Sequence, residues 1–452
     1  MNYIFSTGLP RSGTALLTKA LYESNQASVA VGPNVEIYRF FRNKLIEKYG
    51  SSSLKKKIKK HSPFQDYFAS TEGQELMKLM LSGSLAEKFD KKDWKFFLER
   101  SQAKNDHDSV DLINFFPKLK ANTYERMILN LIKIIKSKRQ IRKSIKKRKL
   151  YYGFHESWNI CSLKTLAHSF PKAKFFVVIR DPRSVYASLC KNAEKRKELR
   201  VQLLSFCRQF RKYIILSNFY LSLPLLKKRL MVIKYEDLVT DPENYLKKIC
   251  KFLKIDFNKN MINPNKYYDF ITKKNWIPHS AFNSKFPKLN NKPIHKWKKY
   301  LKETEVQSIE FLCRNEMCPL DYKFKYQINK KNLIKIFNFI KKDYNKKANW
   351  RTDLRNFDKD KIIEINRHRI LEGKINNDKL NLKKSFLFDD YSLSHLKKHY
   401  KQQFKRFFRF DFKRILKVLE LSQFVIFGVF MGMFFAKIIH NYIAIPFVEQ
   451  NY

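Results

Sequence analysis

The chain has 452 residues, of which 44% are hydrophobic, and this is enough material for one large domain and an extension. Its 93 Lys+Arg against 41 Asp+Glu give a formal net charge of +52, which normally suggests nucleic-acid binding. The basic residues are spread along the chain without a recognisable nucleic-acid module, so we expect no specific nucleic-acid partner. The six cysteines lack C-x-x-C spacing, which argues against a zinc site or a disulfide framework and favours buried reduced thiols.

A glycine loop is predicted near the start of the chain. Tyr3 to Phe5 are apolar, residues 8–14 read Gly-Leu-Pro-Arg-Ser-Gly-Thr, and a helical pattern begins at Leu16. The two glycines allow a tight turn, and the free N–H groups at the start of a helix attract an anion. An ATP-binding loop would carry a lysine where this chain has Thr14. The loop therefore favours another phosphate-bearing donor, with an ordinary strand-to-helix turn as the alternative.

A second strand and helix are predicted around residue 180. The unbroken apolar run 175–179 is typical of a strand buried on both faces of a parallel sheet. Pro182 suits the first turn of the helix that follows. Arg180 then lies at the carboxyl end of the strand, and Ser188 lies about two turns into the helix. Open parallel sheets bind ligands at that edge.

The same strand, turn and helix order returns further along the chain. Residues 232–234 predict a strand, 235–238 a polar turn, and the segment from Pro242 a helix that ends near Leu253. Downstream, the lysine-rich segment 292–299 opens a helix that we expect to continue to Leu312.

These motifs resemble those of sulfotransferases that use 3′-phosphoadenosine 5′-phosphosulfate (PAPS). Residues 9–14 look like the loop that holds the 5′-phosphosulfate, and residues 178–185 with Ser188 look like the 3′-phosphate motif. Residues 235–238 and 252–253 match the usual continuation. Three motifs in the expected order make the resemblance specific, and it covers roughly residues 1 to 325. It is closest to the bacterial and tyrosylprotein-type branch.

The resemblance implies an α/β, P-loop-like three-layer fold with a central, mostly parallel sheet. It also implies transfer of a sulfuryl group from PAPS to a hydroxyl or amine without a metal ion, leaving 3′-phosphoadenosine 5′-phosphate (PAP). Two residues depart from the pattern: Ala15 stands where a second threonine is common, and His155 stands where a lysine is frequent.

The resemblance implies a set of donor-binding residues, which are Pro10, Arg11, Ser12, Gly13, Thr14, Arg180, Ser188, Tyr235 and Lys296. Arg11 also counts as catalytic, because it would stabilise charge that develops on the bridging oxygen. Lys296 resembles the lysine of an element that closes over the nucleotide. Its alternative interpretation is a solvated lysine beside a core tryptophan.

Sulfuryl transfer also requires a base for the acceptor proton. Glu36 follows the first predicted helix, near the place where related enzymes carry a glutamate base. His155 and Glu156 precede the second motif. An acidic turn residue is usually solvated and a single histidine is usually structural, so each candidate has a structural alternative. We rank Glu36 first, His155 second and Glu156 third.

Two other functions remain open at this stage. A P-loop kinase-like phosphotransferase would move a phosphoryl group, and a non-catalytic nucleotide-binding protein would keep the nucleotide contacts without a working base. The acceptor is expected to be a small molecule, a lipid or a glycan.

The sequence predicts three regions: a sulfotransferase domain at 1–325, a basic and mainly helical extension at 326–420, and a hydrophobic segment at 421–452. The uninterrupted apolar run 424–436 is shorter than the roughly 20 residues of a spanning helix. Basic residues precede it, so we expect a cytoplasmic catalytic domain and a tendency toward membrane association. A helix packed on the catalytic domain or on another subunit is the alternative.

Overall fold

A computed structural model describes residues 2–31, 35–57, 71–102, 116–138, 150–269, 274–276, 289, 292–327, 330–346 and 356–371. All of these residues belong to one compact unit, Met1–Leu396. The predicted hydrophobic segment 421–452 and the extension from residue 372 lie outside the described residues. The membrane association and the cytoplasmic location expected from the sequence therefore stay predictions.

A five-stranded sheet forms the centre of the unit. Its strands are β1 (Asn2–Gly8), β2 (Ala27–Val31), β3 (Tyr151–His155), β4 (Ala173–Ile179) and β5 (Leu230–Lys234). They lie in the order β2-β3-β1-β4-β5, and every pairing is parallel. The chain leaves β1 toward β2 and β3 on one side and later adds β4 and β5 on the other. Ligands bind at the carboxyl ends of the strands at such a switch point.

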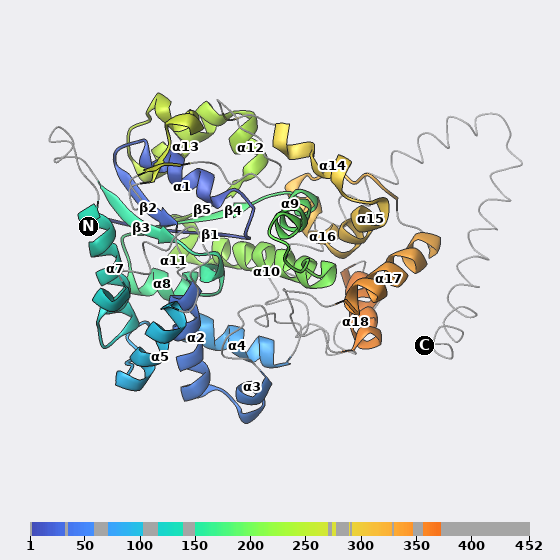
Figure 1. Ribbon diagram of the computed structural model, residues 1–452, viewed down its shortest axis with the longest axis horizontal. Helices are drawn as coiled ribbons and strands as arrows, with labels where there is room; N and C mark the ends of the chain where they lie inside the picture. The colour runs from blue at the N-terminus through green and yellow to red at the C-terminus, as the bar shows by residue number, and fades with distance from the viewer. Residues whose placement is uncertain are drawn as a thin grey trace, which may run out of the picture. The chain divides into compact units, whose positions relative to one another are not determined.

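Helices cover both faces of this sheet (Figure 1). Side chains alternate along each strand, so Phe176 and Val178 of β4 pack with α1 (Thr14–Tyr22), α12 (Tyr235–Thr240) and α13 (Pro242–Leu253). Phe175 and Val177 face the opposite layer, which includes α7 (Tyr124–Lys138), α8 (Leu163–Ser169) and α10 (Leu203–Ser222). The predicted three-layer α/β fold is confirmed.

Further helices surround these layers. They are α2 (Val35–Tyr49), α3 (Ser52–Lys57), α4 (Thr71–Ser82), α5 (Lys91–Gln102), α9 (Pro182–Lys195) and α11 (Pro224–Lys227). Near the carboxyl end of the described chain are α14 (Trp297–Tyr300), α15 (Glu303–Leu312), α16 (Arg314–Met317), α17 (Lys330–Tyr344) and α18 (Phe357–Leu371). The 3-10 helix η4 (Ser157–Cys161) follows β3, and a short antiparallel pair joins β6 (Tyr268–Asp269) to β7 (Lys274–Asn275).

The continuous helix expected from residue 292 to Leu312 is wrong. The segment forms a 3-10 helix, Lys292–His295, then α14 and α15, because the backbone is extended at Leu301 (φ −83°, ψ 140°). The Glu305 carboxylate accepts a hydrogen bond of 2.7 Å from the Lys302 amide, and this caps α15, which begins two residues after Leu301.

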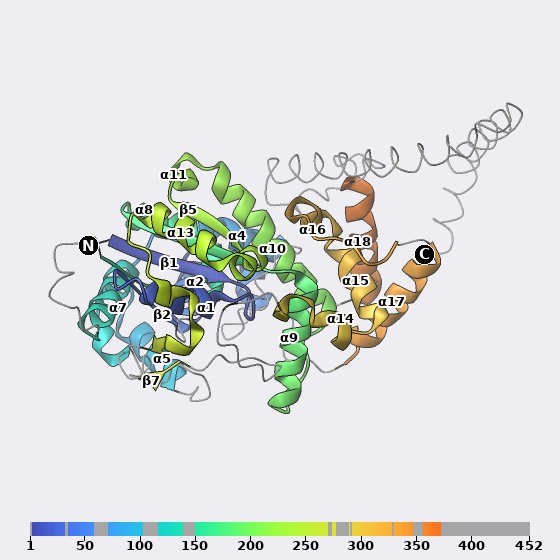
Figure 2. The ribbon, with the colours of Figure 1, turned by 90° about the horizontal axis from the view of Figure 1, so that it is seen from above.

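Helices α17 and α18 pack against the sheet-bearing part of the chain. In both views they lie beside α15, and α17 also contacts α10 (Figures 1 and 2). Arg208 of α10 pairs with Asp360 at 2.7 Å and with Glu364 at 2.9 Å, and Arg211 pairs with Glu364 at 2.5 Å. All four side chains are buried. The domain boundary at residue 325 stays a prediction.

The cysteine prediction is confirmed, because all six cysteines are buried and none forms a disulfide. Of the helices that the structure describes, none has the length and apolar character needed to span a membrane. Among the described residues, no group of three or more His, Cys, Asp or Glu side chains is placed to hold a metal ion.

Candidate active site

The loop between β1 and α1 has a backbone shape that depends on its glycines. Arg11 and Gly13 both have positive φ, at 74° and 97°. Ser12 donates its amide and its hydroxyl to the Leu9 carbonyl, at 3.0 and 2.7 Å, and this closes the turn. A Cβ on Gly13 would lie 2.3 Å from the Tyr235 ring. The start of α1, which has no side-chain cap, is thereby left open to an anion.

The predicted donor-binding residues come together at the carboxyl edge of β1, β4 and β5. Arg11 Nε donates to Ser188 Oγ of α9 at 3.1 Å, and Arg180 Nη1 donates to the Arg11 carbonyl at 3.1 Å. The Arg180 guanidinium lies over the Tyr235 ring, 4.3 Å from its centroid. Two motifs that are distant in sequence therefore share one site, as the parallel sheet predicts.

Lys296 lies directly before α14 and joins this group. Burial and then the nearby charge of Arg180 lower the pKa of Lys296. Two cations brought this close favour an anion between them, because a negative group relieves the repulsion and accepts charge-assisted hydrogen bonds.

A second charged cluster lies beyond the ends of β2 and β3. Glu36, in the first turn of α2, is buried and pairs with buried Arg39, with 2.5 Å between Oε1 and Nη1. Glu156 accepts a 3.0 Å hydrogen bond from the Trp158 amide at the start of η4. Burial raises the pKa of Glu156 to about 8; Arg39 lowers it and Glu36 raises it further. The first and third candidate bases are therefore electrostatic neighbours.

The second candidate, His155, is the last residue of β3. Its Nδ1 lies 3.2 Å from Ser6 Oγ of β1, and burial lowers its pKa to about 4. The ring is therefore neutral at pH 7 and engaged with the neighbouring strand. The ranking of the three bases stays a prediction.

The pH dependence of folding tests the environment of Glu156. A folded-state pKa near 8, above the ordinary 4.5, means that the folded protein holds a proton that the unfolded chain has lost. This proton stabilises the fold at low pH, and the contribution of Glu156 to the free energy of unfolding should fall, by roughly 1.4 kcal/mol per pH unit at most, as pH rises from about 5 to 8. Glu156→Gln should flatten that decline in urea titrations. Glu198→Gln, at an exposed site, is the control; an unchanged slope for Glu156→Gln would contradict the assignment.

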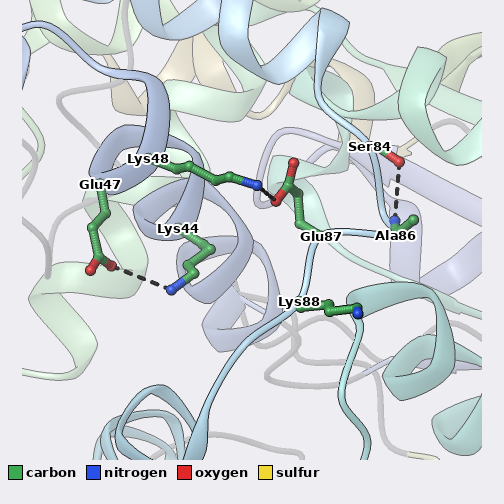
Figure 3. A pocket seen from close by; sticks show the side chains of 7 residues that line it. All are labelled: Lys44, Glu47, Lys48, Ser84, Ala86, Glu87 and Lys88. Carbon is green, nitrogen blue, oxygen red and sulfur yellow. Dashed lines mark hydrogen bonds and ion pairs between the residues drawn. The ribbon is translucent and has the colours of Figure 1, made fainter.

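Another cavity lies away from this edge. Figure 3 shows it between α2 and the segment after α4, lined among others by Lys44, Lys48 and Glu87. Lys48 pairs with Glu87 at 2.9 Å, and Lys44 lies 3.8 Å from Glu47. None of the predicted site residues lines this cavity, and two of its lysines are already neutralised by acidic neighbours. It therefore lies apart from the predicted donor-binding residues.

Sequence reasoning missed two arginines near the site. Arg39 follows Glu36 by three positions in α2, and this helical spacing was the one available signal. Arg183 belongs to the second motif, but its long-range partner Glu310 has no local signal.

Comparisons with known proteins agree with these features. The model of the sulfotransferase family matches residues 3–259. A protein-tyrosine sulfotransferase of Drosophila melanogaster is 30% identical over 111 residues, which are 25% of this chain and 22% of that protein. The chain thus matches about a fifth of this relative's length.

Two solved structures are also similar. The sulfotransferase domain of the Synechococcus PCC 7002 olefin synthase has 16% identity and a TM-score of 0.40, covering 71% of this chain and 94% of that one. The sulfotransferase domain from the curacin biosynthetic pathway has 18% identity and a TM-score of 0.41, covering 72% and 98%. Because the family model matches more than half of the chain, and its match includes the loop after β1 and the turn after β4, this protein belongs to the sulfotransferase family.

Proposed function

We propose that this protein transfers a sulfuryl group from PAPS to a hydroxyl or amine of an acceptor. The observation that carries the proposal is the contact between Arg11 and Ser188, 177 positions apart, which joins the glycine loop to the second motif. One nucleotide with phosphates at both its 5′ and 3′ positions fits two anion sites held this close.

The residues divide into two groups by role. Arg11, Ser12, Gly13 and Thr14 at the start of α1 would hold the 5′-phosphate, while Arg180, Ser188 and Lys296 would hold the 3′-phosphate. Pro10 shapes the loop, and Tyr235 supports Arg180 through the ring contact described above. The residues therefore fit the two phosphate groups of PAPS.

The reaction is an in-line displacement. A bond forms between the acceptor oxygen and sulfur as the bond from sulfur to the 5′-phosphate oxygen breaks, and that oxygen keeps the electron pair. Glu36 takes the acceptor proton. The cations and N–H groups of the loop stabilise the negative charge that develops on the leaving phosphate.

The acceptor of the sulfuryl group is proposed by its chemical class. A small molecule, a lipid or a glycan is expected, and the name of the Drosophila relative adds the tyrosine hydroxyl of a protein. The test incubates the protein with sulfur-labelled PAPS and separately with γ-phosphate-labelled ATP, each with a panel of these acceptors. We expect label transfer from PAPS alone. Transfer from ATP would support a kinase instead, and PAP binding without any transfer would support a non-catalytic protein.

Arg180→Ala should weaken PAP much more than 5′-AMP, because these ligands differ by the 3′-phosphate alone. Loss of a charge-assisted hydrogen bond of about 1.5–3 kcal/mol should raise the PAP dissociation constant by roughly 10- to 100-fold and change that of 5′-AMP by less than about threefold. Isothermal titration with both ligands measures this. Equal weakening of PAP and 5′-AMP binding would mean that Arg180 does not contact the 3′-phosphate.

A further inference from the structure

One buried arginine beside the donor site joins several segments. Arg183, near the start of α9, donates to Asp181 from Nε and Nη2, at 3.0 and 2.7 Å. Its Nη1 donates to Glu310 Oε1 of α15 at 2.5 Å and to the Lys323 carbonyl at 2.9 Å. The guanidinium lies over the Trp297 ring, 4.2 Å from its centroid. Arg183 thus donates hydrogen bonds from the N–H groups in the plane of its guanidinium while the face of the same group packs on an aromatic ring.

Each partner of Arg183 is fixed by further bonds. Asp181 receives a hydrogen bond from the Arg183 amide at 2.9 Å and caps α9, while its own amide donates to Glu236 at 2.9 Å. Glu310 accepts the amides of Lys325 and Tyr326, at 2.9 and 3.0 Å. The β4–α9 turn, α15 and the segment 323–326 therefore form one connected network around a single guanidinium.

This network joins the segments that carry Arg180 and Lys296, the two cations of the proposed 3′-phosphate site. Arg180 precedes Arg183 by three positions, and Lys296 directly precedes Trp297. Ser184 adds a parallel link, since its hydroxyl donates to the Ile294 carbonyl at 2.8 Å. Arg180 and Lys296 repel each other, so a separate attachment is needed to keep their two segments together. Buried ion pairs contribute little net stability, which makes a positioning role the better explanation.

We propose, resting on the proposed function, that Arg183 is a positioning residue for recognition of the 3′-phosphate. It joins the turn that carries Arg180 to the segment that carries Lys296 and does not itself contact the nucleotide.

The experiment compares Arg183→Lys with Arg229→Lys. Lysine keeps the charge of Arg183 but cannot reach Asp181 and Glu310 together or lie flat on Trp297. Arg229 is the matched control, because its guanidinium also bridges segments, donating to the carbonyls of Ala167, Phe170 and Pro171 near the amino end of β4. Dissociation constants for PAP and 5′-AMP and the unfolding temperature are measured for each variant.

We expect Arg183→Lys to raise the PAP dissociation constant by at least about tenfold and that of 5′-AMP by less than about threefold. Arg229→Lys should lower the unfolding temperature without changing the preference for PAP over 5′-AMP. In a Lys296→Met background, Arg183→Lys should have a much smaller effect, because Arg183 acts through Lys296. The proposal would be overturned if the effects of Arg183→Lys and Lys296→Met on PAP binding were fully additive. It would also be overturned if Arg229→Lys lost the preference for PAP as much as Arg183→Lys does.

A second variant covers the case in which Arg183→Lys does not fold. Ser184→Ala removes the parallel link to Ile294 and should lower the preference for PAP by about two- to fivefold; an unchanged preference would overturn the proposal. Failure of the proposed function is distinguishable, because the unaltered protein would then bind PAP no more tightly than 5′-AMP. If the unaltered protein prefers PAP and the variants keep that full preference, the role of Arg183 is contradicted but the proposed function is not.

Discussion

Glu36→Gln is expected to lower turnover by roughly a hundredfold or more and to leave the PAP dissociation constant within about twofold. Glutamine keeps the size of the side chain but cannot take the acceptor proton. Glu36 lies in α2, which follows β2, whereas Arg180 and Ser188, the proposed 3′-phosphate residues, follow β4. The effect should therefore fall on the chemical step. Initial rates with whichever acceptor emerges from the panel, together with PAP titration, measure both quantities.

The Glu36–Arg39 pair requires a control, because removing one member of a buried ion pair destabilises the fold by about 3–5 kcal/mol. Glu36→Asp keeps the charge and a proton acceptor, and it should retain measurable turnover. Unfolding temperatures separate lost chemistry from lost structure. His155→Gln tests the second candidate in the same assay. If Glu36→Gln and His155→Gln both keep full activity, the acceptor side has been misplaced.

Removal of α17 and α18 is expected to prevent stable folding. A chain that ends at Gln327 leaves Arg208 and Arg211 of α10 without Asp360 and Glu364, inside a part of the protein where all four are buried. Glu316 also loses its buried partner Arg367. Each broken buried pair costs about 3–5 kcal/mol, and native domains are stable by about 5–15 kcal/mol. A loss of this size exceeds what most domains tolerate.

The matched control ends at Leu371 and keeps both helices. It should unfold cooperatively and bind PAP, whereas the shorter chain should lack a cooperative transition in circular dichroism. Glu364→Gln gives a milder test. Although burial opposes it, the charges of Arg211 and Arg208 hold the pKa of Glu364 below its ordinary value. The carboxylate thus stabilises the fold above its ordinary pKa, and the variant should be clearly less stable at pH 7. Equal stability of the two truncated chains would show that α17 and α18 are dispensable.

The local signals of the sequence predict β1, β4 and β5 well, because an apolar run followed by glycine, proline or a polar turn and then a helical pattern is visible within about 20 residues. No strand was expected at β2 or β3. β2 has five small or medium residues, and β3 contains Gly153, at which a Cβ would lie 1.6 Å from the Ile4 carbonyl oxygen. That glycine serves the close approach of β1, a contact that the local sequence does not reveal.

The residues of the candidate site also divide into those that the local sequence predicts and those that depend on long-range contacts. Arg11, Arg180 and Ser188 could be predicted because each belongs to a motif at a strand end. The partnership of Arg183 with Glu310 joins residues 127 positions apart, so it depends on the fold as a whole. The break before α15 was missed because Leu301 fits a helical pattern equally well, while its extended backbone and the Glu305 cap are visible only in the structure.

The Tyr235 ring occupies the space that any side chain on residue 13 would need. A side chain at residue 13 is therefore excluded as long as an aromatic ring stands at 235. A smaller residue at 235 would remove the clash but leave the backbone at φ 97°, which still disfavours other side chains. It would also remove the surface on which Arg180 rests. Substitution at residue 13 therefore distorts the loop after β1, and loss of the ring at residue 235 removes the support of Arg180.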